Sequence, residues 1–173
     1  REVMDVSTFE TETLSSEQSD GNRSVRTIVS ERESIHVLHV DDDPEILDLT
    51  RAFLEQTGDE LLVESKTDPS EVATQLRSGS LDVDCIVSDY HMPDMDGLEL
   101  LETVREHDSD LPFILFTGKG SEEIAADAIA AGVTEYLQKG GTEAYSILSN
   151  RIENVVENYR RQRELGRIHT QYQ

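Results

Sequence analysis

The sequence has a single cysteine, no tryptophan and few basic residues. The cysteine, Cys85, cannot form a disulfide within the chain, and its place in an apolar run indicates that it packs as a small hydrophobic side chain. No apolar run is long enough for a membrane-spanning helix, and the first residues lack the charged and then apolar pattern of a secretory signal. We therefore expect a cytoplasmic protein without a membrane partner.

Basic residues are scarce relative to acidic ones. The chain has 15 Lys and Arg against 37 Asp and Glu, which gives a formal net charge of −22. Such a charge repels nucleic acid, so direct nucleic-acid binding is not expected. The regular apolar runs between Ile35 and Tyr159 favour a folded domain with a strongly solvated surface over a disordered chain. An acidic excess of this size indicates a salt-rich cytoplasm, where ions screen self-repulsion.

Apolar runs and turn residues alternate in a pattern that predicts five strands, each followed by a helix. Because the connections are short, we expect an α/β fold with a doubly wound, five-stranded parallel sheet in the flavodoxin-like order 2-1-3-4-5. The strands are expected at Ile35–Val40, Leu61–Glu64, Asp84–Ser88, Pro112–Phe116 and Thr134–Gln138, with helices that begin near Pro44, Asp68, Gly97, Ser121 and Thr142.

Three regions of the chain differ in composition. Residues 1–34 are rich in Ser, Thr and Glu without a sustained apolar period, which is typical of a flexible N-terminal arm. The folded domain is expected at residues 35–158. Because helical composition continues after the last strand has been covered, residues 159–173 are interpreted as a C-terminal helical connector.

The last helix carries apolar residues at the spacing of a coiled-coil seam. Leu148, Ile152, Val155 and Tyr159 recur at intervals of four, three and four residues. The alternative is that they pack on the sheet, which we favour for Leu148 and Ile152. The part of the helix beyond Tyr159 has no sheet to cover, and we interpret it as a connection to a partner chain or to a following module.

Polar side chains follow four of the five predicted strands. Asp41 and Asp42 follow the first strand, Asp89 the third, Thr117 the fourth and Lys139 the fifth. In the expected strand order the first and third strands are adjacent, so their carboxylates converge at the edge where open α/β sheets bind ligands.

These residues lie in four motifs whose order and spacing identify a family. The chain resembles the receiver (CheY-like) domains of two-component response regulators from about residue 35 to residue 158. The motifs that carry the resemblance are Val40–Pro44, Ser88–Gly97, Pro112–Gly118 and Tyr136–Lys139.

The resemblance implies that Asp89 is the phosphoacceptor. A phosphohistidine on a sensor histidine kinase, or a small acyl phosphate, would transfer its phosphoryl group to this carboxylate. Lys139 would place a positive charge at a phosphoryl oxygen, and the Thr117 hydroxyl would move onto another. Tyr136 would be the aromatic side chain that swings inward as Thr117 moves.

The resemblance also implies a Mg²⁺ site, because clustered carboxylates repel an incoming phosphoryl group unless a hard divalent cation is present. Asp42 and Asp89 would bind the ion directly, Asp41 largely through water, and His91 through its backbone carbonyl. Asp43 is interpreted as a helix-start residue rather than a further ligand.

The expected function is a phosphorylation-controlled signalling switch and not an enzyme, apart from its own phosphorylation and dephosphorylation. Besides the kinase, the resemblance allows a downstream output or sensory domain that is reached through the last helix, and a homodimer. Combined with the acidic composition, it leads us to expect a halophilic archaeon as the source.

Two departures from the family pattern affect the site. Receivers usually carry proline straight after the lysine, whereas Gly140-Gly141 follows Lys139, which replaces a rigid turn by a permissive one. His91 and Lys119 stand two residues beyond Asp89 and Thr117, where the family tunes the lifetime of the aspartyl phosphate.

Other functions predict a different reactive residue. An aspartate-nucleophile phosphohydrolase would react at Asp41, because Asp41-x-Asp43 follows the first strand, but Glu45 stands where such enzymes carry Thr or Val. A flavin-binding carrier would need a hydroxyl-rich phosphate loop where the acidic triplet occurs. The identity of the phosphorylated aspartate distinguishes the receiver from the hydrolase.

Overall fold

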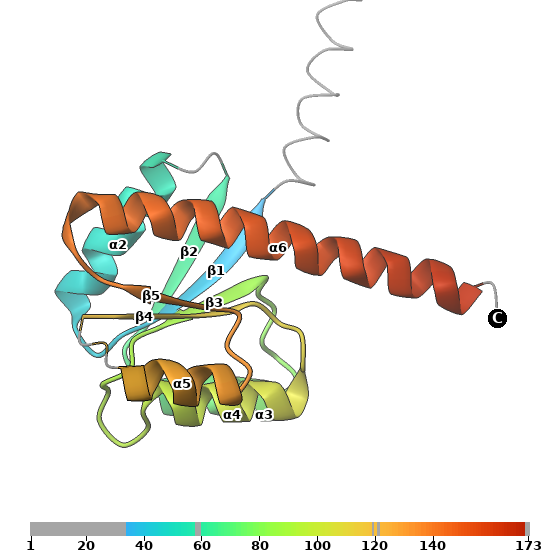
Figure 1. Ribbon diagram of the computed structural model, residues 1–173, viewed down its shortest axis with the longest axis horizontal. Helices are drawn as coiled ribbons and strands as arrows, with labels where there is room; N and C mark the ends of the chain where they lie inside the picture. Colours follow the sequence, from blue (N-terminus) through green and yellow to red (C-terminus); the bar gives the residue numbers. More distant parts are fainter. Residues whose placement is uncertain (1–33, 58–59, 119, 121, 172–173) are drawn as a thin grey trace, which may run out of the picture. The chain divides into compact units, whose positions relative to one another are not determined.

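The computed structural model describes residues 34–57, 60–118, 120 and 122–171, with side chains up to residue 166 (Figure 1). Except for Ser34, the predicted arm at 1–34 lies outside the described residues. Lys119 and the predicted helix start at Ser121 also lie outside them.

The described residues form one five-stranded sheet in the order β2-β1-β3-β4-β5, with every neighbouring pair parallel. This confirms the predicted fold class and strand order. Strand ends differ from prediction by one or two residues; β2 runs on to Lys66 because that residue still pairs with Val40. The strands are β1 (Ile35–Val40), β2 (Leu61–Lys66), β3 (Cys85–Ser88), β4 (Phe113–Thr117) and β5 (Glu135–Gln138).

Side chains near the helix ends explain where several helices begin and stop. Asp68 accepts a hydrogen bond from the Ser70 amide at 2.9 Å at the start of α3, and Asp96 accepts one from the Glu99 amide at 2.9 Å at the start of α4. Gly79 ends α3 in the left-handed conformation, with a φ of 72°. The helices are α2 (Pro44–Thr57), α3 (Pro69–Ser78), α4 (Gly97–His107), α5 (Glu122–Ala130) and α6 (Gly141–Gln171).

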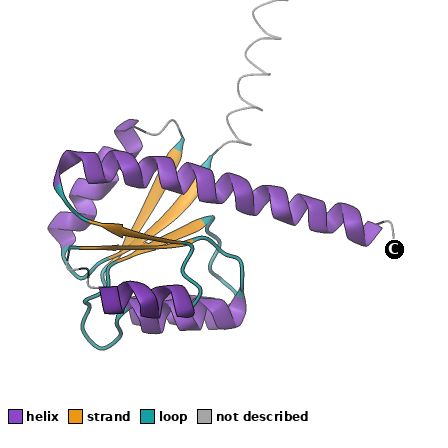
Figure 2. Ribbon diagram, in the orientation of Figure 1, coloured by secondary structure: helices purple, strands orange, loops and turns teal. Residues whose placement is uncertain are grey.

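Helices cover both faces of the sheet (Figure 2). Alternate residues of β4 show the two resulting cores: Ile114 and Phe116 pack on the face covered by α2 and α6, and Phe113 and Leu115 pack on the face covered by α3, α4 and α5. All four are fully buried. Burying a side chain of this size stabilises the fold by roughly 1.5–3 kcal/mol.

The last helix, α6, is 31 residues long and continues past the sheet (Figure 1). The four residues at coiled-coil spacing are all buried in the domain: Leu148 and Ile152 completely, Val155 and Tyr159 to 8% exposure. The structure therefore supports packing within the domain for all four. None of the helices in the described part of the chain is both long and apolar enough to cross a membrane.

Candidate functional site

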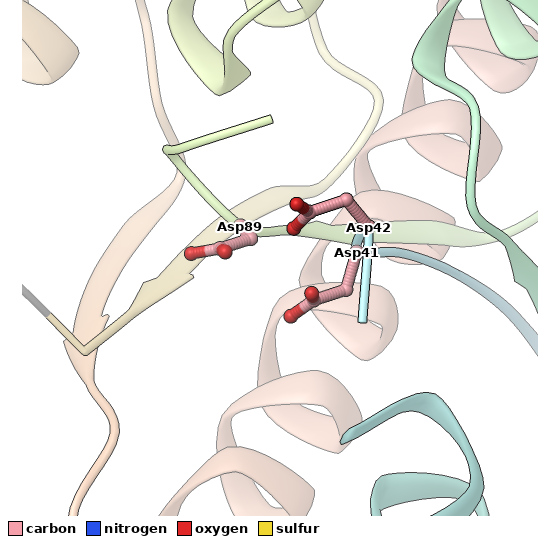
Figure 3. Close-up of side chains that lie close together, drawn as sticks. All are labelled: Asp41, Asp42 and Asp89. Atoms are coloured by element: carbon pink, nitrogen blue, oxygen red, sulfur yellow. The ribbon is translucent and has the colours of Figure 1, made fainter. Parts of the chain in front are cut away.

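Three carboxylates meet at the carboxyl edge of the sheet. Val40 and Ser88, the last residues of β1 and β3, are register partners, and the Asp89 amide donates to the Val40 carbonyl at 2.9 Å. The strands therefore deliver Asp41, Asp42 and Asp89 to one place (Figure 3). One oxygen from each of these three residues lies within 4.8 Å of the others. Asp41 is buried, Asp89 is partly buried and Asp42 is exposed.

Local hydrogen bonds fix the loop that carries Asp41. Its Oδ1 accepts from the Asp43 amide at 3.0 Å. The Oδ1 of Asp43 in turn accepts from the Glu45 amide at 3.0 Å, in the first turn of α2. This confirms that Asp43 serves as the helix-start residue and separates its role from that of the other two acids.

Lys139 brings a positive charge to the carboxylates from the end of β5. Its Nζ lies 2.8 Å from Oδ2 of Asp41 and 3.5 Å from Oδ1 of Asp89. The Lys139 amide donates to the Thr117 carbonyl at 2.9 Å, which ties the ends of β4 and β5 together. These contacts hold Lys139 at the site although the permissive Gly140-Gly141 follows it.

The environment of Asp89 works against its charged form. Burial raises the pKa of Asp89; Lys139 counteracts this rise, and Asp41 adds to it. The Tyr90 amide donates to Asp89 Oδ1 at 2.8 Å and also favours the charged carboxylate. A nucleophilic carboxylate here therefore depends on nearby positive charge.

Thr117 and Tyr136 both carry hydroxyl oxygens that are buried without a well-formed hydrogen bond to any described residue. Thr117 still lies close enough to Asp89 to help lower the pKa of that carboxyl. The Tyr136 ring packs against the core of the α3–α5 face, and its hydroxyl occupies the space where a Cβ on Gly120 would stand. Of the predicted switch pair, Thr117 thus lies beside Asp89, whereas Tyr136 packs on the α3–α5 face near Gly120.

His91 is exposed, and its ring meets the Tyr90 ring edge-on with centroids 4.6 Å apart. It lies at the rim of a surface hollow that opens onto Asp89. Sequence reasoning did not assign Ile46 or Gly118 to this hollow, because neither residue type signals a site. The lining consists of Ile46, Asp89, His91, Thr117, Gly118 and Lys139.

Sequence reasoning also missed the role of Gly97, the first residue of α4. A Cβ at Gly97 would overlap the Asp89 carbonyl oxygen and a methyl group of Leu115. The Gly97 amide donates to the Tyr90 carbonyl at 2.9 Å. A glycine directly after Asp96, the cap of α4, was the available signal, and it marks a close approach of backbone to the loop that bears Asp89.

The position of His36 and His39 on a strand predicts that both are neutral, packed histidines rather than metal ligands. The structure distinguishes the two. His39 is buried, and burial lowers its pKa to about 4, so the expectation of a neutral packed histidine is confirmed. His36 is exposed, and the packed interpretation was wrong for this residue. It is the second residue of the strand, and burial is complete only from the third residue, Val37, onward.

Comparison with known proteins connects this geometry to a family. The family model described as "Response regulator receiver domain" matches residues 37–147. The DctD C4-dicarboxylate transport transcriptional regulatory protein of Pseudomonas aeruginosa is 38% identical over 103 residues, which cover 60% of this chain and 21% of that protein. The transcriptional regulatory protein FixJ of Bradyrhizobium diazoefficiens is 30% identical over 104 residues, which cover 60% of this chain and 49% of FixJ.

Solved structures show the same relationship. A CheY-like response regulator receiver domain protein from Methanospirillum hungatei superimposes with a TM-score of 0.64 at 27% identity, covering 75% of this chain and 98% of that one. A receiver domain protein from Clostridium thermocellum gives a TM-score of 0.65 at 25% identity, covering 73% of this chain and 97% of that one. The chain thus corresponds to whole receiver structures, but only to between a fifth and a half of DctD and FixJ.

Proposed function

The chain belongs to the response regulator receiver domain family, and from that premise we propose that Asp89 is the phosphoacceptor of a two-component phosphorelay. The observation that carries the proposal is the convergence of Asp41, Asp42 and Asp89 with the Lys139 ammonium at one edge of the sheet. The phosphoryl donor is a phosphohistidine on a sensor histidine kinase.

In the transfer, a carboxylate oxygen of Asp89 forms the new bond to phosphorus. The bond between phosphorus and the donor imidazole nitrogen breaks, and the electron pair stays on that nitrogen. Lys139 balances charge on a phosphoryl oxygen from the position it already holds beside Asp89. Thr117 supplies a hydroxyl that has no well-formed hydrogen bond to a described residue and is therefore available to a phosphoryl oxygen.

The donor set fits Mg²⁺, which prefers oxygen ligands in an octahedral arrangement and keeps some of its waters. Asp42 and Asp89 would hold the ion directly, Asp41 through water, and His91 through its backbone carbonyl. When bound, the ion neutralises the carboxylates and the incoming phosphoryl oxygens. This charge opposes the effects of burial and of Asp41, which raise the pKa of Asp89.

The domain acts as a switch rather than as an enzyme that processes a separate substrate. Thr117 and Tyr136 are the residues we assign to the conformational response, and α6 is the element that leads to an output module or partner. DctD and FixJ are transcriptional regulatory proteins, and another relative, RpfG of Xanthomonas campestris, is a cyclic di-GMP phosphodiesterase response regulator. We propose that this receiver, like those of the relatives, controls an output module. We also propose that it acts in the cytoplasm.

The phosphohydrolase alternative, with Asp41 as nucleophile, is not favoured. The Asp41 side chain is 1% exposed, and its two oxygens already accept from Lys139 Nζ and from the Asp43 amide. Asp43, the second acid that such an enzyme needs, is engaged as the helix-start residue of α2.

The test is treatment with acetyl phosphate in the presence and absence of Mg²⁺, followed by intact mass measurement. Wild type gains one phosphoryl group only with Mg²⁺, and Asp89→Asn gains none. Asp94→Asn is the matched control, because Asp94 lies in the same loop, is exposed and has a φ of 69°, which asparagine tolerates. Phosphorylation of Asp89→Asn at the wild-type level would contradict the proposal.

We also propose that the protein works in a salt-rich cytoplasm, as in a halophilic archaeon. The support is the net charge of −22, which produces self-repulsion that salt screens. The melting temperature is therefore expected to rise steeply between low salt and molar KCl. Melting that does not respond to salt contradicts the proposal.

A further inference from the structure

The strongest feature outside the phosphorylation site is the junction where α6 leaves the sheet. The Tyr159 hydroxyl donates to Oδ2 of Asp108 at 2.8 Å. The Tyr159 ring is 8% exposed and belongs to the core of the α3–α5 face, although α6 itself covers the opposite face. The side chain therefore reaches around the amino edge of the sheet, at the far end of the strands from Asp89.

Asp108 is a rigid acceptor for this hydrogen bond. It ends α4, with its amide donating to the Val104 carbonyl at 2.8 Å. Its other oxygen, Oδ1, accepts from the amides of Asp110 and Leu111 at 2.9 and 3.1 Å. Because one carboxylate oxygen is fixed by the α4–β4 connection, the second is held in place toward Tyr159. Burial and the Asp108 hydrogen bond raise the pKa of Tyr159 to about 12, so the phenol remains a donor.

The next residue of α6 makes a second attachment. Arg160 Nη2 lies 3.1 Å from Oδ2 of Asp84, the residue that precedes β3. The same oxygen accepts from the His36 amide of β1 at 2.8 Å. One helical turn after Tyr159, the Arg163 guanidinium lies over the Tyr159 ring, 5.4 Å from its centroid.

Neighbouring residues of α6 are thus joined to the α4–β4 connection, through Asp108, and to Asp84, which precedes β3 and accepts from β1. An isolated exposed helix of about a dozen residues is only marginally stable in water. A helix without side-chain attachments where it leaves the sheet would therefore bend or fray from that point. Here the attachments are made at the exit point itself.

We propose that Tyr159 and Arg160 form a latch that fixes the direction of the projecting part of α6 relative to the receiver core. The projecting part is then a rigid arm, and a module or partner reached through it is oriented by the junction rather than held on a flexible tether. The signalling meaning of this arm rests on the proposed function, whereas the latch itself does not. Tyr159 and Arg160 are positioning residues and lie outside the phosphorylation site.

The test measures the distance between spin labels on the arm and on the core in the full chain. Leu165→Cys on the arm and Glu102→Cys on α4 are both exposed sites. The native Cys85 does not interfere, because it is buried and burial raises the pKa of its thiol. The latch predicts one narrow distance distribution for the otherwise unchanged protein.

Two variants remove one attachment each: Tyr159→Phe deletes only the hydroxyl, and Arg160→Gln removes the guanidinium that pairs with Asp84. Loss of a single hydrogen bond shifts the population from attached toward detached states by up to about tenfold. Each variant is therefore expected to at least double the width of the distance distribution. Tyr145→Phe is the matched control on the same helix, because its ring packs against Phe53 and Phe116. The Tyr145→Phe variant is expected to keep the narrow distance distribution of the unchanged protein.

A broad distribution in the unchanged protein overturns the latch, and so does a narrow one that persists in either variant. Thermal melts of the core accompany each measurement, so that loosening of the arm is separated from unfolding of the domain. Acetyl phosphate uptake is measured in parallel. Because the spin-label readout needs no phosphate, absence of uptake counts against the proposed function and leaves the latch result unaffected.

Discussion

The Lys139 ammonium lies 2.8 Å from Oδ2 of Asp41, closer than its 3.5 Å approach to Oδ1 of Asp89. One lysine therefore joins the carboxylates that follow β1 and β3, although 98 residues separate it from Asp41 in the sequence. If Asp89 is the phosphoacceptor as proposed, the Lys139 charge lies where negative charge increases during phosphoryl transfer, and it is held there before the transfer begins.

Replacement of Lys139 tests this role. Lys139→Ala is expected to reduce the rate of phosphorylation by acetyl phosphate about a hundredfold, because a positioned charge at the phosphoryl oxygen is lost. The measurement is the rate of mass gain under saturating Mg²⁺. Lys66→Ala is the control, since the Lys66 ammonium pairs with the exposed Glu71 at 3.4 Å and the substitution leaves the Lys66 carbonyl, which accepts from the Asp41 amide, in place. Equal rates for both variants would show that Lys139 has no part in the transfer.

Gly97 is predicted to be intolerant of even a methyl group. Gly97→Ala places a Cβ against the Asp89 carbonyl and the Leu115 side chain, so we expect a loss of about 1–3 kcal/mol in the free energy of unfolding and slower phosphorylation. Urea unfolding followed by circular dichroism measures the first effect. Gly118→Ala is the control, because a Cβ there meets nothing within 4 Å. Equal stability of the two variants would contradict the close approach.

Two tyrosines are predicted to respond in opposite ways to removal of the hydroxyl. The Tyr136 hydroxyl is buried without a hydrogen-bond partner among the described residues, so Tyr136→Phe removes an unsatisfied group and is expected to raise stability by about 1 kcal/mol. Tyr159→Phe removes the donor to Asp108 and is expected to lower stability by about 1–2 kcal/mol. Denaturant titrations measure the change in the free energy of unfolding of each variant. Changes of the same sign in the two variants contradict the prediction.

His39 is predicted to make stability depend on pH. Burial lowers its pKa from 6.5 to about 4, so between these values the unfolded chain binds a proton that the folded chain does not. Stability on this account falls as the pH drops from 6.5 toward 4, by on the order of 3 kcal/mol for this residue. Urea titrations across this range measure the slope. His39→Leu flattens it, and His36→Gln, at an exposed site, leaves it unchanged; an unaltered slope in His39→Leu contradicts the assignment.

The parts of the site that sequence could predict follow from local pattern and strand order. Asp41 and Asp89 were expected to converge because the alternation of strands and helices specifies the sheet, and the sheet places β1 beside β3. The role of Asp43 followed from its position before a helix that opens with proline. These inferences need only the periodicity of apolar residues along the chain and the residue types in its turns.

The remaining features depend on contacts between distant residues. Tyr159 has the spacing of a coiled-coil residue, and only the three-dimensional course of α6 shows that it reaches Asp108, 51 residues earlier. The pairing of Lys139 with Asp41 is likewise a matter of side-chain geometry. The end of β4 at Thr117, one residue beyond the prediction, reflects its pairing with Gln138 rather than its own propensity.

The most direct test of the phosphorylation site is to trap the acyl phosphate chemically. Borohydride reduces an aspartyl phosphate to homoserine, and tandem mass spectrometry of the digested protein then identifies the reduced position. After acetyl phosphate and Mg²⁺, the reduced residue is predicted to be Asp89. Reduction at Asp41, or at no aspartate of a protein that melts as a folded domain, would contradict it.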